Sequence, residues 1–264
     1  MADRTRPPPI SREATDARPP APPGIDANRS IRNASITAGT GILLLSVLAG
    51  FGKFVALDGL VTPGNPAQTT TEIMESEGLL RLGIVSMVLV IALDIVVAWA
   101  LYRVFSPVST GISLLAAWFR IVYAGVWLVA VGQLAGVLRL LSDDAYLTAF
   151  SPDQLQAQAL LGINAFDDVW TAGLFLFGVH LLVVGYLAYR SGYVPRILGG
   201  LLAIAGAGYV VDSLGAMLSR NPWTDIATFT FIGEFLLALW LVIWGRRLAV
   251  SGAGRHDDQI PVAR

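Results

Sequence analysis

The sequence predicts an all-α fold, a polytopic transmembrane helix bundle of six spans that follows a disordered tail rich in proline and arginine. The chain is 55% hydrophobic and only 14% charged, whereas soluble proteins carry about 25% charged residues. The apolar residues also gather into six stretches, each about as long as the 20 residues that a helix needs to cross a bilayer. These stretches are Ile36–Leu57, Leu79–Arg103, Gly111–Leu138, Gly162–Arg190, Val194–Leu218 and Ile226–Trp244.

Three regions follow from this composition. Residues 1–33 are predicted to form a disordered cytosolic tail, because seven of the fourteen prolines lie between Pro7 and Pro23, close to several arginines. Such a segment buries too little apolar surface to offset the entropy lost on ordering. Residues 34–248 are predicted to form the six-helix transmembrane domain, and residues 249–264 a second disordered cytosolic tail. This length leaves no room for another sizeable domain.

The helix boundaries carry recognisable signals. Asn65 followed by Pro66 is typical of a helix N-cap with proline at the first helical position, so a short helix is expected before the second span. Ser151 and Gln154 form a Ser-x-x-Gln capping box, and the helix that they begin is expected to continue into the fourth span. Short turns at 106–110 and 191–195 join neighbouring antiparallel helices.

The distribution of charge predicts the orientation. Basic residues in the N-terminal tail, at Arg103, at Arg190 and Arg196, and after the last span all fall on one side of the bundle, while the opposite side is rich in acidic residues. Because positively charged loops stay in the cytosol, the chain is expected in the cytoplasmic (inner) membrane, multi-pass, with both termini cytosolic. The lipid bilayer is then its first partner.

Ionisable residues interrupt the predicted spans at two depths. From a rise of 1.5 Å per residue, Asp94, Arg120, His180 and Glu234 lie about 14–18 Å from the predicted cytosolic ends of their helices, near the middle of the bilayer. We call these four residues the inner polar layer. Asp212 and Asp168 lie about 27–30 Å from the same side. With Lys53 of the first span, they form a predicted outer polar layer near the opposite interface. Asp168 and its neighbour Asp167 are also consistent with a helix end in the headgroup region.

The inner polar layer permits three interpretations. Charged residues within a membrane are costly and often belong to ion or solute pathways, so binding or translocation of a proton or a small polar or ionic solute is the first. An intramembrane enzyme that uses Glu234 or Asp94 with His180 is the second. The third is a structural or regulatory membrane subunit in which the charges only fix helix packing. Because Arg120 keeps its proton, it is expected to pair with Asp94 or Glu234 in each case.

Other functions are not indicated by the residues present. The formal net charge of −1 shows no excess of basic residues that would indicate binding to nucleic acid. The chain has no cysteine, which excludes disulfides and thiolate metal sites. Its two histidines and the absence of nucleotide-binding and zinc-protease motifs predict no metal and no cofactor, so an enzyme is the less favoured class. The oligomeric state is not predicted.

Several motifs resemble a known family. They are Leu115-Ala-Ala-Trp-Phe-Arg120, Phe150-Ser-Pro-Asp-Gln154, Phe177-Gly-Val-His180, Arg190-Ser-Gly-Tyr-Val-Pro-Arg196, Gly208-Tyr-Val-Val-Asp212 and Gly233-Glu234. Together they resemble the bacterial multi-pass membrane family catalogued as domain of unknown function 4386, over roughly residues 34–244. The resemblance implies a bacterial inner-membrane protein with six or seven helices and supplies no activity. It implies recurring polar positions at Arg120, His180, Asp212 and Glu234.

Overall fold

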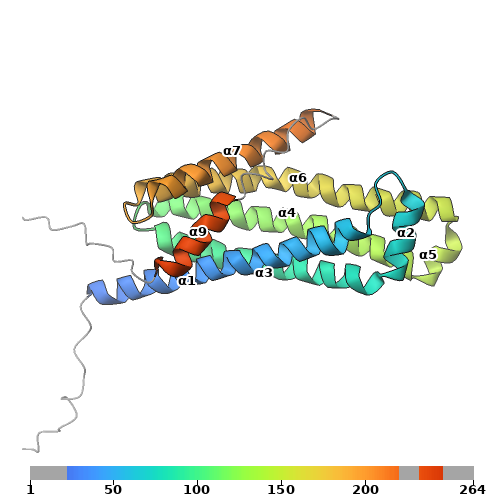
Figure 1. Ribbon diagram of the computed structural model, residues 1–264, viewed down its shortest axis with the longest axis horizontal. Helices are drawn as coiled ribbons and strands as arrows, with labels where there is room; N and C mark the ends of the chain where they lie inside the picture. Colours follow the sequence, from blue (N-terminus) through green and yellow to red (C-terminus); the bar gives the residue numbers. More distant parts are fainter. Residues whose placement is uncertain (1–22, 220–231, 246–264) are drawn as a thin grey trace, which may run out of the picture.

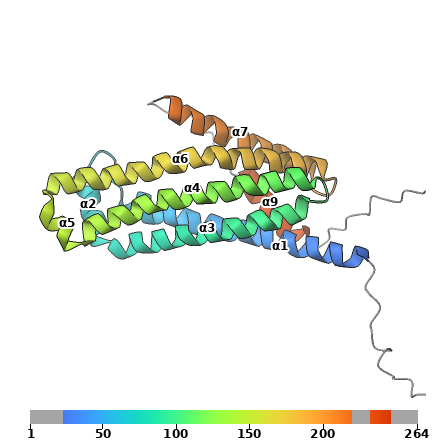
Figure 2. The ribbon, with the colours of Figure 1, turned by 180° about the vertical axis from the view of Figure 1, so that it is seen from behind.

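The computed structural model describes residues 23–219 and 232–245, and within them every regular element is a helix. Four long helices, α1, α3, α4 and α6, run side by side along the bundle (Figures 1 and 2). Short helices α2 and α5 lie at one end, which we call the far end, and the tight α3–α4 and α6–α7 turns lie at the other, the corner end. The predicted all-α bundle is confirmed.

The first span begins earlier than predicted. Helix α1 covers Pro23–Gly50 and continues as a π-helix, Phe51–Leu57, and a short 3-10 turn, Asp58–Leu60. Residues 23–33, which the sequence places in the tail, are therefore helical. Proline is compatible with the first turn of a helix, and Ile31 already begins the buried face of α1 at the spacing that continues through Ala34, Ala38 and Ile42. Residues 1–22 and 249–264 lie outside the described residues.

The middle helices follow their sequence signals. Helix α2 is Pro66–Glu75, with the Asn65 side chain accepting the Gln68 amide, and α3 is Glu77–Phe105. Helix α4 spans Thr110–Ser142 and α5 spans Asp144–Ala149. Helix α6, Pro152–Arg190, begins at the predicted Ser151 capping box and continues without a break through the fourth span, which confirms the expected continuous helix. A short turn then leads to α7, Arg196–Leu218.

Close backbone contacts hold α7 and α9 to the bundle. On the α6–α7 interface a Cβ atom on Gly206 would lie 2.5 Å from the Gly178 carbonyl oxygen. Only a residue without a side chain permits such proximity, as is common between membrane helices. Helix α9, Ile232–Ile243, packs between α1 and α7. A Cβ atom on Gly39 of α1 would lie 2.7 Å from the Ala238 carbonyl oxygen of α9.

Five described helices are long and apolar enough to cross a membrane: Arg29–Leu60, Glu77–Phe105, Thr110–Ser142, Pro152–Arg190 and Arg196–Leu218. Large apolar side chains such as Leu82, Trp99 and Trp118 are exposed on their outer faces, as expected where lipid is the solvent. The sixth predicted span, Ile226–Trp244, is described only from residue 232, where the shorter apolar helix α9 lies. These features are those of a multi-pass membrane protein.

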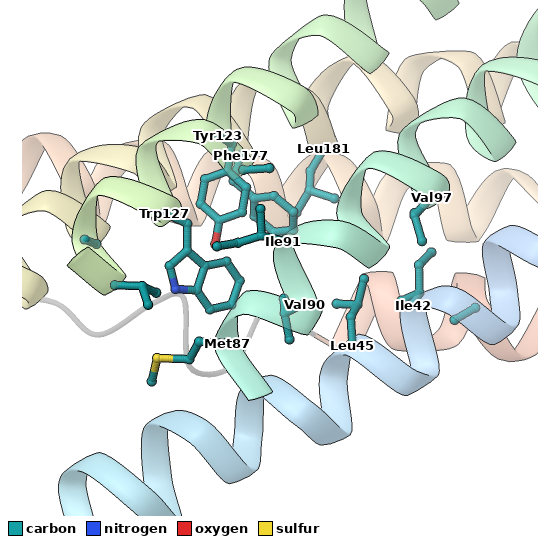
Figure 3. Packing of buried hydrophobic residues seen from close by; sticks show 14 of the residues in the cluster. Ile42, Leu45, Met87, Val90, Ile91, Val97, Tyr123, Trp127, Phe177 and Leu181 are labelled. Atoms are coloured by element: carbon teal, nitrogen blue, oxygen red, sulfur yellow. The ribbon is translucent and has the colours of Figure 1, made fainter. Parts of the chain in front are cut away.

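Apolar side chains fill the space between the helices. Figure 3 shows Ile42 and Leu45 of α1 meeting Val90 and Val97 of α3. On the opposite side of α3, Ile91 lies beside the aromatic rings of Tyr123 and Trp127 of α4 (Figure 3). The polar side chains considered next lie within this packed interior, so their neighbours are largely apolar or aromatic.

Candidate functional site

The inner polar layer forms one connected cluster around the guanidinium of Arg120. Its Nε donates to Asp94 Oδ1 at 2.8 Å, and its Nη1 donates to Glu234 Oε1 at 2.8 Å. Nη1 also lies 3.3 Å from His180 Nε2. The four side chains come from α3, α4, α6 and α9, so residues up to 140 positions apart in the sequence share one guanidinium. The predicted pairing of Arg120 with Asp94 or Glu234 is confirmed with both.

Helical periodicity explains why these residues face inward. Arg120 belongs to the buried face of α4, where Ala116, Tyr123 and Trp127 follow the same three- and four-residue spacing. Asp94 lies on the buried face of α3 between Val90 and Val97. Arg120 has a relative exposure of 0%, and Asp94 and His180 of 1%. The Glu234 side chain is 14% exposed, so Glu234 is the member of the layer with measurable access to the surroundings.

One oxygen of Asp94 carries most of the contact with Arg120. Arg120 Nη2 lies 2.7 Å from Asp94 Oδ1, the oxygen that also accepts from Nε. This close approach is not a hydrogen bond, and Nη2 is a buried donor without a hydrogen-bond acceptor among the described residues. The pair is held by the hydrogen bond from Nε and by charge at close range, and one guanidinium nitrogen retains capacity to donate.

The contacts of His180 identify its protonation pattern. Its Nδ1 lies 2.8 Å from the backbone carbonyl oxygen of Ala116. Since a carbonyl oxygen only accepts, Nδ1 carries the hydrogen, and Nε2 of the neutral ring then accepts from Arg120. A second proton on Nε2 would point an N–H group at the N–H groups of Arg120. His180 therefore fits the cluster as a neutral acceptor.

Aromatic rings enclose this cluster, and they were not among the residues predicted for the site. The Arg120 guanidinium carbon lies 5.4 Å from the centre of the Phe177 ring, within cation–π range. Phe177 also contacts the rings of Tyr123 and Tyr209, at centroid distances of 4.9 and 5.4 Å. Tyr123 accepts a hydrogen bond of 3.3 Å from Trp170 Nε1. The sequence did contain one indication of these aromatic neighbours. The spacing of Arg120, Tyr123 and Trp127 places all three on the same face of α4.

The outer polar layer differs from its predicted composition. Lys53 Nζ, in the π-helix, lies 2.6 Å from Asp58 Oδ1 and 3.0 Å from Asp167 Oδ1. The same ammonium lies over the rings of Phe166 and Trp170. Asp168, predicted in the same layer as Lys53, is exposed. Consecutive residues of an α-helix point about 100° apart, so when Asp167 faces Lys53 its neighbour turns away.

The remaining member of the predicted outer layer is Asp212, which lies half-buried on α7. The close partners of Lys53 are thus carboxylates on its own segment and on α6. Within residues 23–219 and 232–245 no group of three or more histidine, aspartate and glutamate side chains is arranged to hold a metal ion. In the inner polar layer, the guanidinium of Arg120 occupies the central position that a metal ion would need.

The motif that resembles the family most specifically, residues 190–196, builds the α6–α7 corner. Gly192 has a φ of +71°, a backbone conformation suited to glycine. The hydroxyl of Tyr193 donates to the Val104 carbonyl oxygen of α3 at 2.6 Å, and its ring stacks on Phe105. Burial raises the pKa of this tyrosine above its usual value. The motif therefore fastens the corner to α3, remote from the inner polar layer.

Comparison with known proteins identifies one family. Residues 37–245 match the family described as "Domain of unknown function (DUF4386)". A protein of Archaeoglobus fulgidus named "Uncharacterized protein" is 37% identical over 166 residues, which are 63% of this chain and 85% of that protein. No solved structure matches the chain.

Proposed function

The chain belongs to the family of domain of unknown function 4386, and from the geometry of its inner polar layer we propose that it binds a proton there and translocates it, alone or with a small polar or ionic solute. The observation that carries this proposal is that a single buried guanidinium faces two carboxylates, Asp94 and Glu234. Polar residues at this depth are costly, and in membrane proteins they commonly belong to ion and solute pathways.

The charge of the layer indicates what it would bind. Arg120 contributes +1, Asp94 and Glu234 contribute −1 each when ionised, and neutral His180 contributes nothing, so the sum is −1. A net charge surrounded by apolar side chains is costly, because little solvent is present to stabilise it. One added proton brings the sum to zero. The surrounding Phe177, Tyr123 and Tyr209 contribute no opposing charge at neutral pH.

Glu234 is the member best suited to take this proton. Asp94 lies close to two guanidinium nitrogens and its side chain is 2% exposed, whereas the 14% exposed side chain of Glu234 has one contact with Arg120. Glu234 also lies on α9, the short helix that packs against α1 and α7. In the protonated state the Glu234 carbonyl oxygen could still accept from Arg120, so the cluster could gain and lose a proton without being dismantled.

Replacing Glu234 by Gln tests the proposal, because the amide oxygen can still accept from Arg120 while the titratable group is removed. In proteoliposomes containing a pH-sensitive dye, an imposed pH gradient should dissipate faster with the wild-type chain than in protein-free vesicles. Glu234→Gln should reduce this flux to the protein-free rate. Its melting temperature in detergent should equal or exceed that of the wild type, because the inner polar layer becomes neutral.

Glu77→Gln is the matched control, because Glu77 makes an exposed pair with Arg81 in the first turn of α3. This variant should retain wild-type flux. If Glu234→Gln has the same flux as the wild type, Glu234 is not part of the proton pathway. A wild-type chain that gives no flux above protein-free vesicles, with the inner layer intact, would refute proton translocation.

A structural role is the second candidate, and one observation favours it. All four residues of the inner polar layer have partners on other helices, and three of them are almost completely buried. Interhelical polar contacts of this kind can fix the register of a membrane bundle. If this were the whole role, the wild-type chain would have no flux, and variants of the layer would alter only stability.

The proposal includes a location. We place the chain in the cytoplasmic membrane with both termini in the cytosol, where lipid and a small solute would be its partners. This placement is supported by Gly245, the last described residue, whose backbone packs against Ser35 of α1 at the corner end. Arg103 at the same end binds Ser30 through a 2.6 Å hydrogen bond. The arginines of both short turns would then face the cytosol, as the positive-inside rule requires.

A further inference from the structure

A cleft at the far end of the bundle combines charges of both signs. It has a volume of about 620 Å³ and lies between the start of α3, the end of α4 and the start of α5. Arg81 and Arg139 supply two guanidinium groups, and Asp143 and Asp144 supply two carboxylates. Leu138 and Ala135 contribute an apolar wall. This site is separate from the inner polar layer and does not depend on its function.

The charges in the cleft retain capacity to bind a ligand. Arg81 directs its Nε and one Nη toward Glu77, which leaves its other Nη group. Among the described residues Arg139 is exposed and has no ion-pair partner, and neither Asp143 nor Asp144 is paired with a cation. Asp143 Oδ1 accepts from the Ala145 amide, as the N-cap of α5. Guanidinium groups match phosphate, and carboxylates accept from ammonium.

The position of Arg81 places the cleft at the depth of lipid headgroups. Arg81 and Arg103 are separated on α3 by about 33 Å at 1.5 Å per residue, close to the roughly 30 Å of a bilayer core. The exposed apolar surface of α3 begins directly after Arg81, with Leu82 60% and Val85 55% exposed. Arg81 therefore marks the interface opposite the corner end, where lipid phosphates would lie.

A second concavity also has Arg139 in its lining. It has a volume of about 470 Å³, shares Arg139 with the cleft, and lies between α4 and α6. Gly136 and Gly162 form part of its lining, and a Cβ atom on Gly136 would meet no other atom within 4 Å. Leu161 and Val137 add apolar surface, and Gln133, Tyr146 and Gln158 add polar groups. A headgroup held at Arg139 would have space beside it for the first part of an acyl chain.

We propose that the cleft binds a membrane phospholipid whose headgroup carries a phosphate and a primary ammonium but no carboxylate, that is, phosphatidylethanolamine. The phosphate would contact Arg81 and Arg139, and the ammonium would donate to Asp143 and Asp144. Phosphatidylcholine has a quaternary ammonium without N–H donors, and phosphatidylglycerol has no ammonium at all. The two acidic residues thus select the zwitterionic lipid with a hydrogen-bonding cation.

Native mass spectrometry of the delipidated full chain tests this assignment, with phosphatidylethanolamine, phosphatidylcholine and phosphatidylglycerol of equal chain length added in turn. Phosphatidylethanolamine should bind about tenfold or more tightly than either other lipid, as one or two additional charge-assisted hydrogen bonds imply. The double variant Arg139→Gln/Asp143→Asn should lose this preference. Asparagine is a good N-cap, so α5 should be retained.

Arg190→Gln is the control, because Arg190 is exposed at the corner end, and it should keep the wild-type preference. If the double variant does not fold, Arg139→Gln alone, at an exposed position, serves in its place and should weaken binding of phosphatidylethanolamine. Equal binding of the three lipids, or a cleft variant that behaves like Arg190→Gln, would overturn the proposal. Displacement of the lipid by soluble phosphoethanolamine at equal concentration would overturn the lipid as the source of the headgroup.

Discussion

Removing the positive charge at the centre of the inner polar layer should strongly destabilise the bundle. In Arg120→Leu, the carboxylates of Asp94 and Glu234 lose the guanidinium that lies within 2.8 Å of each. Two carboxylates then remain in an apolar interior with no compensating cation among the contacts described. Breaking a buried pair by removing one partner costs about 3–5 kcal/mol in soluble proteins. We expect a similar loss in the free energy of unfolding here.

The size of the effect can be measured as a shift in melting temperature. For a chain of this length, 1 kcal/mol corresponds to about 2–4 °C, so Arg120→Leu should melt about 6–20 °C below the wild type in detergent. Arg190→Leu changes an exposed arginine at the corner end and should shift stability by no more than about 0.5 kcal/mol. Differential scanning fluorimetry on matched preparations would provide both values.

A third variant separates the effect of charge on stability from the effect of packing. The variant Arg120→Leu combined with Asp94→Asn and Glu234→Gln removes the cation and both carboxylates, so the layer is neutral again. Because residues in direct contact are not additive, this triple variant should recover much of the stability that Arg120→Leu loses. Arg120→Leu that melts within about 2 °C of the wild type would refute the reasoning, since about 0.5–1 kcal/mol is too little for two uncompensated buried charges.

Three further outcomes are expected. Gly206→Ala places a Cβ atom 2.5 Å from a carbonyl oxygen of α6 and should cost about 1–3 kcal/mol in thermal melts, whereas Gly132→Ala, in open space, should be neutral or stabilising. Tyr193→Phe should cost about 0.5–1.5 kcal/mol, and because burial raises the pKa of this tyrosine, the difference from wild type should persist below about pH 10 and shrink at higher pH in pH-dependent melts. Reporter fusions at Arg264 and within 69–71 should report opposite sides of the membrane, and a cytosolic signal from 69–71 would reverse the proposed topology.

The sequence predicts the inner polar layer because depth along a helix depends only on the number of residues. Asp94, Arg120 and His180 lie on helices that turn at the corner end, and a constant rise per residue brings them to the same level. All three helices are long and apolar, so their existence and approximate ends follow from hydropathy. Depth along the helices was therefore sufficient to group residues from these three helices without knowledge of their contacts.

The depth of a residue along its helix does not determine the direction in which its side chain points around the helix axis. Asp167 and Asp168 have almost the same depth, yet of these two only Asp167 faces Lys53, while Asp168 is exposed. The aromatic neighbours of Arg120 were missed for a related cause, since an aromatic residue in an apolar span does not indicate which helix it meets. The start of α1 was misplaced because proline-rich composition obscured the buried spacing that begins at Ile31.

The order in which the charges occur along the chain has a consequence for biosynthesis. Asp94 and Arg120 belong to consecutive helices, α3 and α4, joined by a short turn. When this hairpin leaves the ribosome and partitions into lipid, the arginine enters with its counter-ion already synthesised, and the hairpin core is neutral. His180 follows without adding charge, and Glu234 arrives with α9, after all the other members. The carboxylate proposed to exchange a proton is thus the last member of the inner polar layer to be synthesised, and Arg120 has Asp94 as a counter-ion before it.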